Sequence, residues 1–235
     1  MTSEVKASSG ANSLPLLSVN DLTIKIPDVY GDISIVSGID LEIGDGEIVG
    51  LVGESGSGKS LTALAVMGLI HRVGGDVGSN TSILLNGEDL RTKSEREMRW
   101  ISGGQIAMIF QDPMMTLNPL LRIDTQMIEA ILAHESVSKD TARQRARDAL
   151  GMVGISSPDE RLRAYPHQFS GGMRQRVVIA ISMLHAPDII IADEPTTALD
   201  VTIQAQILYE MQKLRQNHSV SIIWITHDLS VISAL

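Results

Sequence analysis

The sequence of 235 residues contains no cysteine. Disulfides, thiolate metal sites and iron–sulfur clusters built from its own residues are therefore excluded, and the composition is compatible with a reducing compartment. No apolar run approaches the roughly 18 to 20 residues that cross a bilayer. Residues 1–15 are polar and small, without the charged start and apolar middle of a secretory signal. We expect a disordered segment at 1–15 and a domain that stays in the cytoplasm unless a partner holds it at a membrane.

Basic residues are outnumbered by acidic ones. The chain has 19 Lys and Arg against 28 Asp and Glu, a formal net charge of −9. This balance gives no support for a nucleic-acid footprint along the sequence, so no nucleic-acid partner is expected, although a local basic patch stays possible. Hydrophobic residues make up 43% of the chain, enough at this length for a substantial core. We expect one large domain or a domain with an inserted subdomain.

The hydrophobic pattern alternates between strand and helix periods. Residues 16–26 and 33–43 mix alternation with β-branched side chains, and 47–53 is a short apolar run suited to a buried central strand. Further strands are expected at 81–87, 105–110, 188–193 and 219–226, and helices at 59–71, 95–100, 177–184 and 201–216. This alternation predicts an α/β sheet.

Between residues 116 and 169 the pattern changes. Ile123, Met127 and Ile131 fall at helical spacing, a second helical stretch covers 139–153, and no convincing strand lies between them. The sequence therefore predicts one α/β domain over 16–235 that carries a helical subdomain at about 115–170.

Residues 53–60, with the sequence GESGSGKS, match the phosphate-binding pattern G-x-x-x-x-G-K-[ST]. They lie between an apolar strand and a helix, as a P-loop requires. Backbone N–H groups of the glycine-rich loop close around the β-phosphate, Lys59 supplies a charge for the β- and γ-phosphates, and the Ser60 hydroxyl ligates Mg²⁺. The residues assigned to nucleotide binding here are Gly53, Glu54, Ser55, Gly56, Ser57, Gly58, Lys59 and Ser60.

An acidic pair follows the apolar run 189–192. At the carboxyl end of that strand, Asp193 is placed to hold Mg²⁺ through water, and Glu194 to polarise the attacking water. Asp193 lies 193 − 59 = 134 residues beyond Lys59. This spacing is long for a compact switch-type GTPase and leaves room for the helical insertion.

A second anion site is indicated at residues 170–172, where Ser-Gly-Gly opens a helix. Free backbone N–H groups and the positive end of the helix dipole favour an anion there. Because the P-loop already supplies one phosphate cradle, the pattern raises the question of which anion this second site receives.

The remaining motifs resemble those of ABC transporter ATPases. Residues 110–113 (FQDP), 169–176 (FSGGMRQR), 198–200 (ALD) and 226–228 (THD) follow the order of that family's Q-loop, signature, D-loop and H-loop. The stretches FQDPMMTLNP and YPHQFSGGMRQR look most like the subunits that energise import of dipeptides, oligopeptides or nickel. The resemblance covers about residues 16 to 235 and implies a P-loop NTPase fold of the ABC type.

The resemblance implies further roles. Gln111 would reach Mg²⁺ and the attacking water while its loop senses the transmembrane subunits, and His227 would contact the γ-phosphate and orient Glu194. Asp200 would lie at a dimer interface, and its plain reading as the N-cap of the next helix holds beside that role. Ser170, Gly171 and Gly172 would bind the γ-phosphate held by the P-loop of another chain.

The adenine ring in this family usually stacks on an aromatic residue before the P-loop. Tyr30 is the only aromatic residue before Gly53 and is the candidate by elimination. Alignment places Ile26 at the usual aromatic position, and a surface tyrosine in the turn 27–32 is the alternative reading.

The resemblance implies ATP and Mg²⁺ as cofactors and an ATP hydrolase that drives peptide import across a bacterial inner membrane. The implied partners are a second homologous ATPase subunit in a head-to-tail dimer, two transmembrane permease subunits and a periplasmic substrate-binding protein. The chain would then lie peripherally on the cytoplasmic side of that membrane. The family's fold continues beyond the H-loop, so we expect a C-terminally truncated member.

Three other readings stay open. The first is an importer ATPase for nickel or another small solute, and the second is a nucleotide-binding module without turnover. The third is a soluble ABC ATPase acting on DNA or ribosomes. It would predict zinc-binding cysteines, a long coiled-coil insertion, two cassettes or a basic face, and none is evident in the sequence.

Overall fold

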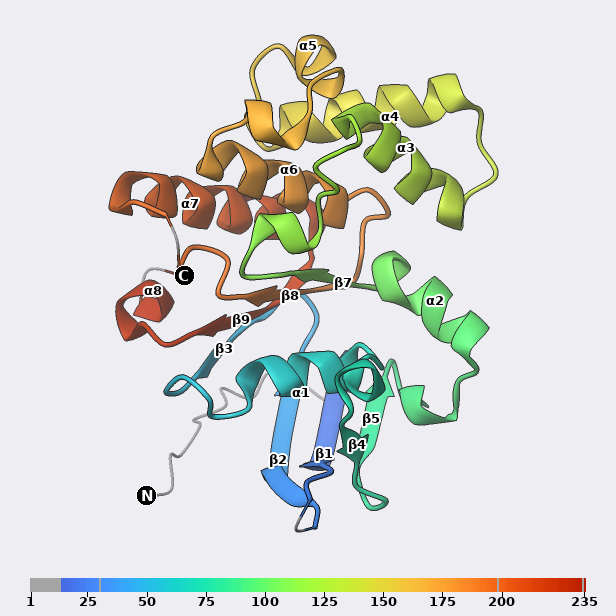
Figure 1. Cartoon of the computed structure of the whole chain (residues 1–235), viewed down its shortest axis with the longest axis vertical. Helices are drawn as coiled ribbons and strands as arrows, with labels where there is room; N and C mark the ends of the chain where they lie inside the picture. Colours follow the sequence, from blue (N-terminus) through green and yellow to red (C-terminus); the bar gives the residue numbers. More distant parts are fainter. Residues whose placement is uncertain (1–13, 30, 198, 234) are drawn as a thin grey trace.

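The computed structural model describes residues 14–29, 31–197, 199–233 and 235. Two sheets with helices packed around them make up the described part (Figure 1). Residues 1–13 and Tyr30, for which the sequence predicts a disordered segment and an adenine contact, lie outside it. Within the described residues, no helix is both long enough and apolar enough to cross a membrane.

The first sheet is antiparallel and contains the two long strands near the start of the chain. Strand β1 pairs with β2 from Leu17↔Ile43 to Ile26↔Ile33, and with β5 on its other side from Leu17↔Leu85 to Asn20↔Ser82. The order is β2-β1-β5-β6, and β4 also pairs with β1. The strands are β1 Leu17–Ile26, β2 Ile33–Ile43, β4 Asp76–Val77, β5 Ser82–Leu85 and β6 Glu88–Asp89.

The second sheet is parallel, in the order β3-β9-β8-β7. Its strands are β3 Ile48–Val52, β7 Ile106–Ile109, β8 Ile189–Asp193 and β9 Ser221–Thr226. All residues of β8 and β9 are buried, as expected for strands with both faces covered. Because the strands are parallel, their carboxyl ends meet at one edge, where the P-loop, Gln111, Glu194 and His227 follow them.

The expectation of a buried central strand at 47–53 is wrong. Strand β3 is at one edge of the described sheet and pairs only with β9, and its five residues are half-buried or exposed. Close packing occurs at Gly50, where an added Cβ would lie 2.9 Å from Cδ1 of Ile232 in α8 (Leu229–Ser233). An edge strand has no hydrogen-bonded neighbour on its free side, so its apolar run is only partly covered.

The helix after the P-loop is shorter than the pattern predicts. Helix α1 covers Lys59–Val66, and a 3₁₀ turn follows at Ile70–Val73. Gly68, at φ 68°, breaks the helix because its left-handed conformation cannot continue a right-handed one. Element α2, by contrast, covers Glu95–Gly104 and begins at a capping box between Ser94 and Glu97; it passes its predicted end but is kinked at Ser102 and Gly103, whose backbone is non-helical.

Residues 116–169 contain helices and no strand, as predicted. Figure 1 shows α3, α4 and α5 at the far side of α6 and α7 from the parallel sheet. The helices are α3 Ile123–His134, α4 Lys139–Met152, α5 Pro158–Leu162, α6 Gly171–Ser182 and α7 Val201–His218.

Alternating side chains of β8 join two separate hydrophobic clusters. Ile190 and Ala192 pack in the cluster shared with α3, α4, α6 and α7. Ile189 and Ile191 pack in the cluster shared with α1 and the antiparallel sheet. Successive side chains of a strand point to opposite faces, so the parallel sheet lies between the helical layer and α1. Packing on both faces holds in place the sheet edge that carries the motifs.

Candidate functional site

The P-loop is shaped by close approaches that only glycine permits. An added Cβ at Gly58, whose φ is 91°, would lie 2.6 Å from Cγ2 of Val36 in β2. At Gly53 it would lie 2.7 Å from Oγ of Ser57. Gly58 is therefore favoured both by its left-handed backbone and by its contact with β2, whereas a larger residue at Gly53 would have to displace the Ser57 hydroxyl.

Lys59 lies under this loop with only 8% of its surface exposed. Its Nζ donates hydrogen bonds to the carbonyl oxygens of Gly53 and Glu54, each at 2.8 Å. Helix α1 begins here with no side-chain cap, so its first N–H groups stay free. An ammonium and the positive end of a helix at one point make a site suited to an anion.

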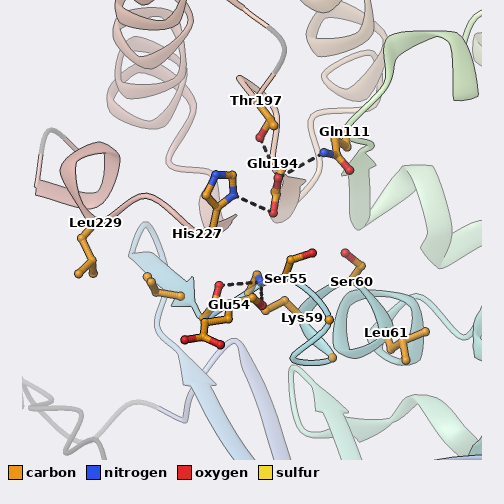
Figure 2. Close-up of a pocket in the computed structure, with 14 residues that line it drawn as sticks. Glu54, Ser55, Lys59, Ser60, Leu61, Gln111, Glu194, Thr197, His227 and Leu229 are labelled. Carbon is orange, nitrogen blue, oxygen red and sulfur yellow. Dashed lines mark hydrogen bonds and ion pairs between the residues drawn. The ribbon is translucent and has the colours of Figure 1, made fainter.

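Glu194 lies across the cavity from the P-loop, and three other side chains contact its carboxylate (Figure 2). Its Oε2 accepts hydrogen bonds from Thr197 Oγ1 at 2.8 Å and from Gln111 Nε2 at 3.3 Å. Its Oε1 lies 3.2 Å from Nδ1 of His227. Gln111 follows β7, Glu194 follows β8 and His227 follows β9, so the strand order β9-β8-β7 gathers the three predicted catalytic residues.

The environment of Glu194 favours the charged carboxylate. Burial alone would raise the pKa of Glu194, but the hydrogen bonds from Thr197 and His227 and the charge of Lys59 outweigh it and hold the pKa below its usual value. The group is therefore ionised near neutral pH, and it is placed to accept a proton from a water in the cavity.

Asp193 is in a different environment one residue earlier. It is 7% exposed, and burial raises its pKa, while the Ser60 hydroxyl and Lys59 act in the opposite direction. Its Oδ1 is buried and has no hydrogen-bond partner among the described residues. A buried carboxylate oxygen without a partner is costly, and together with a nearby hydroxyl it forms a donor set suited to a hard cation such as Mg²⁺.

The described residues contain no cluster of three or more His, Asp or Glu side chains that could hold a metal alone. Mg²⁺ in phosphate-processing sites is bound through one or two protein oxygens plus phosphates and waters. Ser60 and Asp193 fit that pattern.

The P-loop and the Glu194 cluster enclose an open cavity of about 850 Å³. Its volume is in the range of small-molecule and cofactor sites. Thr197 and Leu229 line it and are absent from the sequence-based predictions. The lining residues are Val52, Gly53, Glu54, Ser55, Gly56, Gly58, Lys59, Ser60, Leu61, Gln111, Glu194, Thr197, His227 and Leu229.

The signature residues lie elsewhere. Ser170 caps α6, and its Oγ accepts a hydrogen bond from Met173 N at 3.4 Å. Asp200 caps α7 by accepting from Ile203 N at 3.0 Å, so its plain reading as an N-cap is observed. Within the described part of the chain, neither of them, nor Gly171 or Gly172, lines the P-loop cavity. The chain does not bring these residues to its own phosphate site.

Comparison with known proteins agrees with these motifs. A family model described as ABC transporter matches residues 36–197. The dipeptide transport ATP-binding protein DppD of Bacillus subtilis is 49% identical over 218 residues, which are 93% of this chain and 65% of that protein. DppD of Escherichia coli is 47% identical over 220 residues, 94% of this chain and 67% of that protein. The chain thus spans about two thirds of the length of these relatives.

A solved structure shows the same fold. The ATP-binding cassette MJ0796, determined as a dimer in a post-hydrolysis state bound to ADP and Pi, superposes with a TM-score of 0.79 at 26% identity, over 93% of this chain and 90% of that chain. The predicted fold class, a P-loop NTPase cassette with an inserted helical subdomain, is confirmed. With a family model over most of its length and relatives near half identity, the chain belongs to the ABC transporter ATP-binding family.

Proposed function

We propose that this chain binds ATP with Mg²⁺ and hydrolyses the nucleotide as the ATP-binding subunit of a bacterial peptide importer. The observation that carries the proposal is the Glu194 carboxylate, held by Gln111 and His227 on the side of the cavity opposite the P-loop. A P-loop alone binds a phosphate. An ionised carboxylate facing it adds a base for water.

Each residue then has a part in hydrolysis. The P-loop N–H groups and the Lys59 ammonium bind the β- and γ-phosphates and stabilise the charge that develops on them. Ser60 and Asp193 would hold Mg²⁺ and Gln111 would contact it; when bound, the ion would offset the phosphate charge. Glu194 would orient a water toward the γ-phosphorus and accept its proton as the bond from that phosphorus to the ADP oxygen breaks, and His227, 3.2 Å from Glu194 Oε1, would hold the carboxylate and contact the γ-phosphate.

The proposal includes a second ATPase subunit. Ser170, Gly171 and Gly172 open α6 away from the P-loop cavity of their own chain, and Ser170 and Gly171 are exposed. In a head-to-tail pair they would complete the partner's site, with Asp200 at the same interface. The related cassette MJ0796 is dimeric.

Peptide transport is supported by the names of the relatives. DppD and OppD of Bacillus subtilis, 49% and 48% identical to the chain, are dipeptide and oligopeptide transport ATP-binding proteins. On this proposal two permease subunits and a periplasmic binding protein complete the importer, and the chain works peripherally on the cytoplasmic side of the inner membrane.

The decisive experiment replaces Glu194 with glutamine. Glu194→Gln keeps the shape of the side chain and removes the base, so ATP turnover should fall roughly 10²- to 10⁴-fold while ATP affinity is kept. Turnover is measured by phosphate release and affinity by calorimetric titration. Glu129→Gln, an exposed position on α3, is the matched control and should behave as the original chain.

Two outcomes would contradict the proposal. Equal turnover by E194Q and the original chain would remove Glu194 from the role of base. Tight ATP binding by the original chain without any turnover would identify a nucleotide-binding module instead of an ATPase.

A further inference from the structure

The turn that follows β8 links Thr197 to Glu194 twice. The backbone N–H of Thr197 donates to the carbonyl oxygen of Glu194 at 3.3 Å, which closes a four-residue turn through Pro195. The Thr197 hydroxyl donates to Oε2 of the same Glu194 at 2.8 Å. Main chain and side chain of one residue therefore hold both the backbone and the carboxylate of Glu194.

Glu194 needs such support because its backbone is unusual. Its φ is 45°, in the left-handed region that a glutamate rarely adopts, and its N–H is tied to Ile225 O at 3.0 Å. A long side chain leaving such a turn has several rotamers available. The hydroxyl of Thr197 provides a short hydrogen bond to a charged acceptor, which is stronger than a bond between neutral groups.

Thr197 differs from the other two residues that contact the carboxylate. Gln111 and His227 reach it from the ends of β7 and β9, and their bonds are longer, at 3.3 and 3.2 Å. Thr197 belongs to the same turn as Glu194, and its β-branched side chain has few χ1 rotamers. The threonine hydroxyl is thus the contact of Glu194 with the least freedom to move.

We propose that Thr197 is a positioning residue for ATP hydrolysis: its hydroxyl fixes Oε2 of Glu194 and so sets the orientation of the carboxylate over the P-loop cavity. The inference rests on the proposed function. Thr197 acts through Glu194 and neither accepts the proton of the water nor binds the phosphates, so its loss should lower kcat and leave ATP affinity unchanged.

The test compares valine and serine at this position. Thr197→Val keeps the branched shape and removes the hydroxyl, and kcat should fall about 10- to 100-fold, the range expected when a catalytic group loses its fixed orientation. Thr197→Ser restores the hydroxyl and should recover most of the rate. ATP affinity, from calorimetric titration, should stay within about twofold for both, since the Thr197 hydroxyl contacts Glu194 and lies outside the P-loop proposed to bind the phosphates.

Thr92→Val is the matched control. It removes a hydroxyl bond of the same kind, from Oγ1 to Asp89 O at 2.7 Å, in the antiparallel sheet region away from the cavity, and should leave kcat unchanged. If T197V folds poorly, as judged by its melting temperature, Thr197→Ala is used for the same comparison.

A double variant separates the inference from a direct role. If Thr197 acts only through Glu194, adding T197V to E194Q should cause no further loss of kcat. A further loss equal to that of T197V alone would overturn the inference, as would a T197V rate equal to that of the original chain or a T197S rate as low as that of T197V. In all three cases the effect of E194Q itself stays intact, so the proposed function survives; absence of turnover in the original chain would overturn both.

Discussion

Lys59 shows how one side chain prepares the anion site. The residue is only 8% exposed, and its ammonium donates two hydrogen bonds of 2.8 Å to carbonyl oxygens of the P-loop. The charge is therefore held in place beside the first N–H groups of α1, which have no side-chain cap. The lysine side chain therefore loses little conformational freedom when a phosphate binds.

We expect Lys59→Met to weaken ATP binding roughly 10- to 100-fold, the value of one hydrogen bond between charged groups. Calorimetric titration with ATP measures the change. Lys25→Met removes an exposed lysine of β1 that does not line the cavity, and it should bind ATP as the original chain does. Equal weakening by both variants would mean that general charge, and not this site, attracts the nucleotide.

Single residues also show what the sequence could predict. The P-loop is one continuous run whose chemistry resides in its own backbone, so its pattern is sufficient. Glu194 could be placed because an acidic residue after a buried strand must emerge at the sheet edge. Thr197 could not be predicted to contact Glu194, because threonines that follow a proline by one or two residues are common in turns. The available signal was its position three residues after Glu194, which allows an i to i+3 turn to return its hydroxyl.

At the scale of helices and strands, an ion network away from the P-loop cavity joins the residues just after α3 and just after α6 to the middle of α4. Glu135, directly after α3, pairs with Arg145 of α4 and with His185, whose Nδ1 lies 3.0 Å away. Arg145 also donates from Nη2 to Leu184 O, just past α6, at 2.7 Å. The hydrogen bond from Arg145 lowers the pKa of Glu135 to about 2; burial opposes this shift, and His185 adds to it. The network ties α6, which begins at the signature, to the helical subdomain.

The lowered pKa of Glu135 predicts how the free energy of unfolding changes with pH. Because the pKa of Glu135 is depressed on folding, the stabilisation is present above the unfolded value of about 4.5 and is lost as the pH falls toward about 2. The free energy of unfolding of Glu135→Gln should therefore lie below that of the original chain at pH 7, and the difference should shrink between pH 4.5 and pH 3. Urea denaturation at a series of pH values measures it.

Glu95→Gln is the control for that series. Its carboxylate is exposed and lies 3.8 Å from Arg99, so its removal should cost little at any pH. If the difference in free energy of unfolding between E135Q and the original chain stayed constant down to pH 3, the ion network would not titrate in this pH range.

Strand and helix ends were the least predictable parts. The apolar run of β3 looks like that of a central strand, but the order β3-β9-β8-β7 depends on which strands pair across the chain, and a local pattern does not contain that information. Helix α1 stops before Gly68 although the apolar spacing continues through Leu69. In both places a tertiary or conformational constraint overrides a hydrophobic pattern that is locally correct.

At the scale of the whole molecule, the two features that we propose bind phosphate, the P-loop and the Ser170–Gly172 turn, are separated. The P-loop opens α1 beside the antiparallel sheet, whereas Ser170 opens α6 in the helical layer on the other side of the parallel sheet (Figure 1). Ser170 lines no part of the P-loop cavity in the described chain. A site that combines the two features therefore requires two chains, and in a two-fold dimer each chain supplies one half of each site.

Mixing two inactive variants tests this arrangement. Ser170→Ala should bind ATP as the original chain does and lose hydrolysis, and E194Q should do the same for a different reason. In a mixed dimer, one site combines the intact P-loop and Glu194 of the S170A chain with the intact Ser170 of the E194Q chain. A 1:1 mixture should therefore recover about one quarter of the wild-type sites, as random pairing in a two-fold dimer predicts, and phosphate release measures the recovery. If Ser170 served the P-loop of its own chain, every site in the mixture would contain one defect, and hydrolysis would stay at the level of the separate variants.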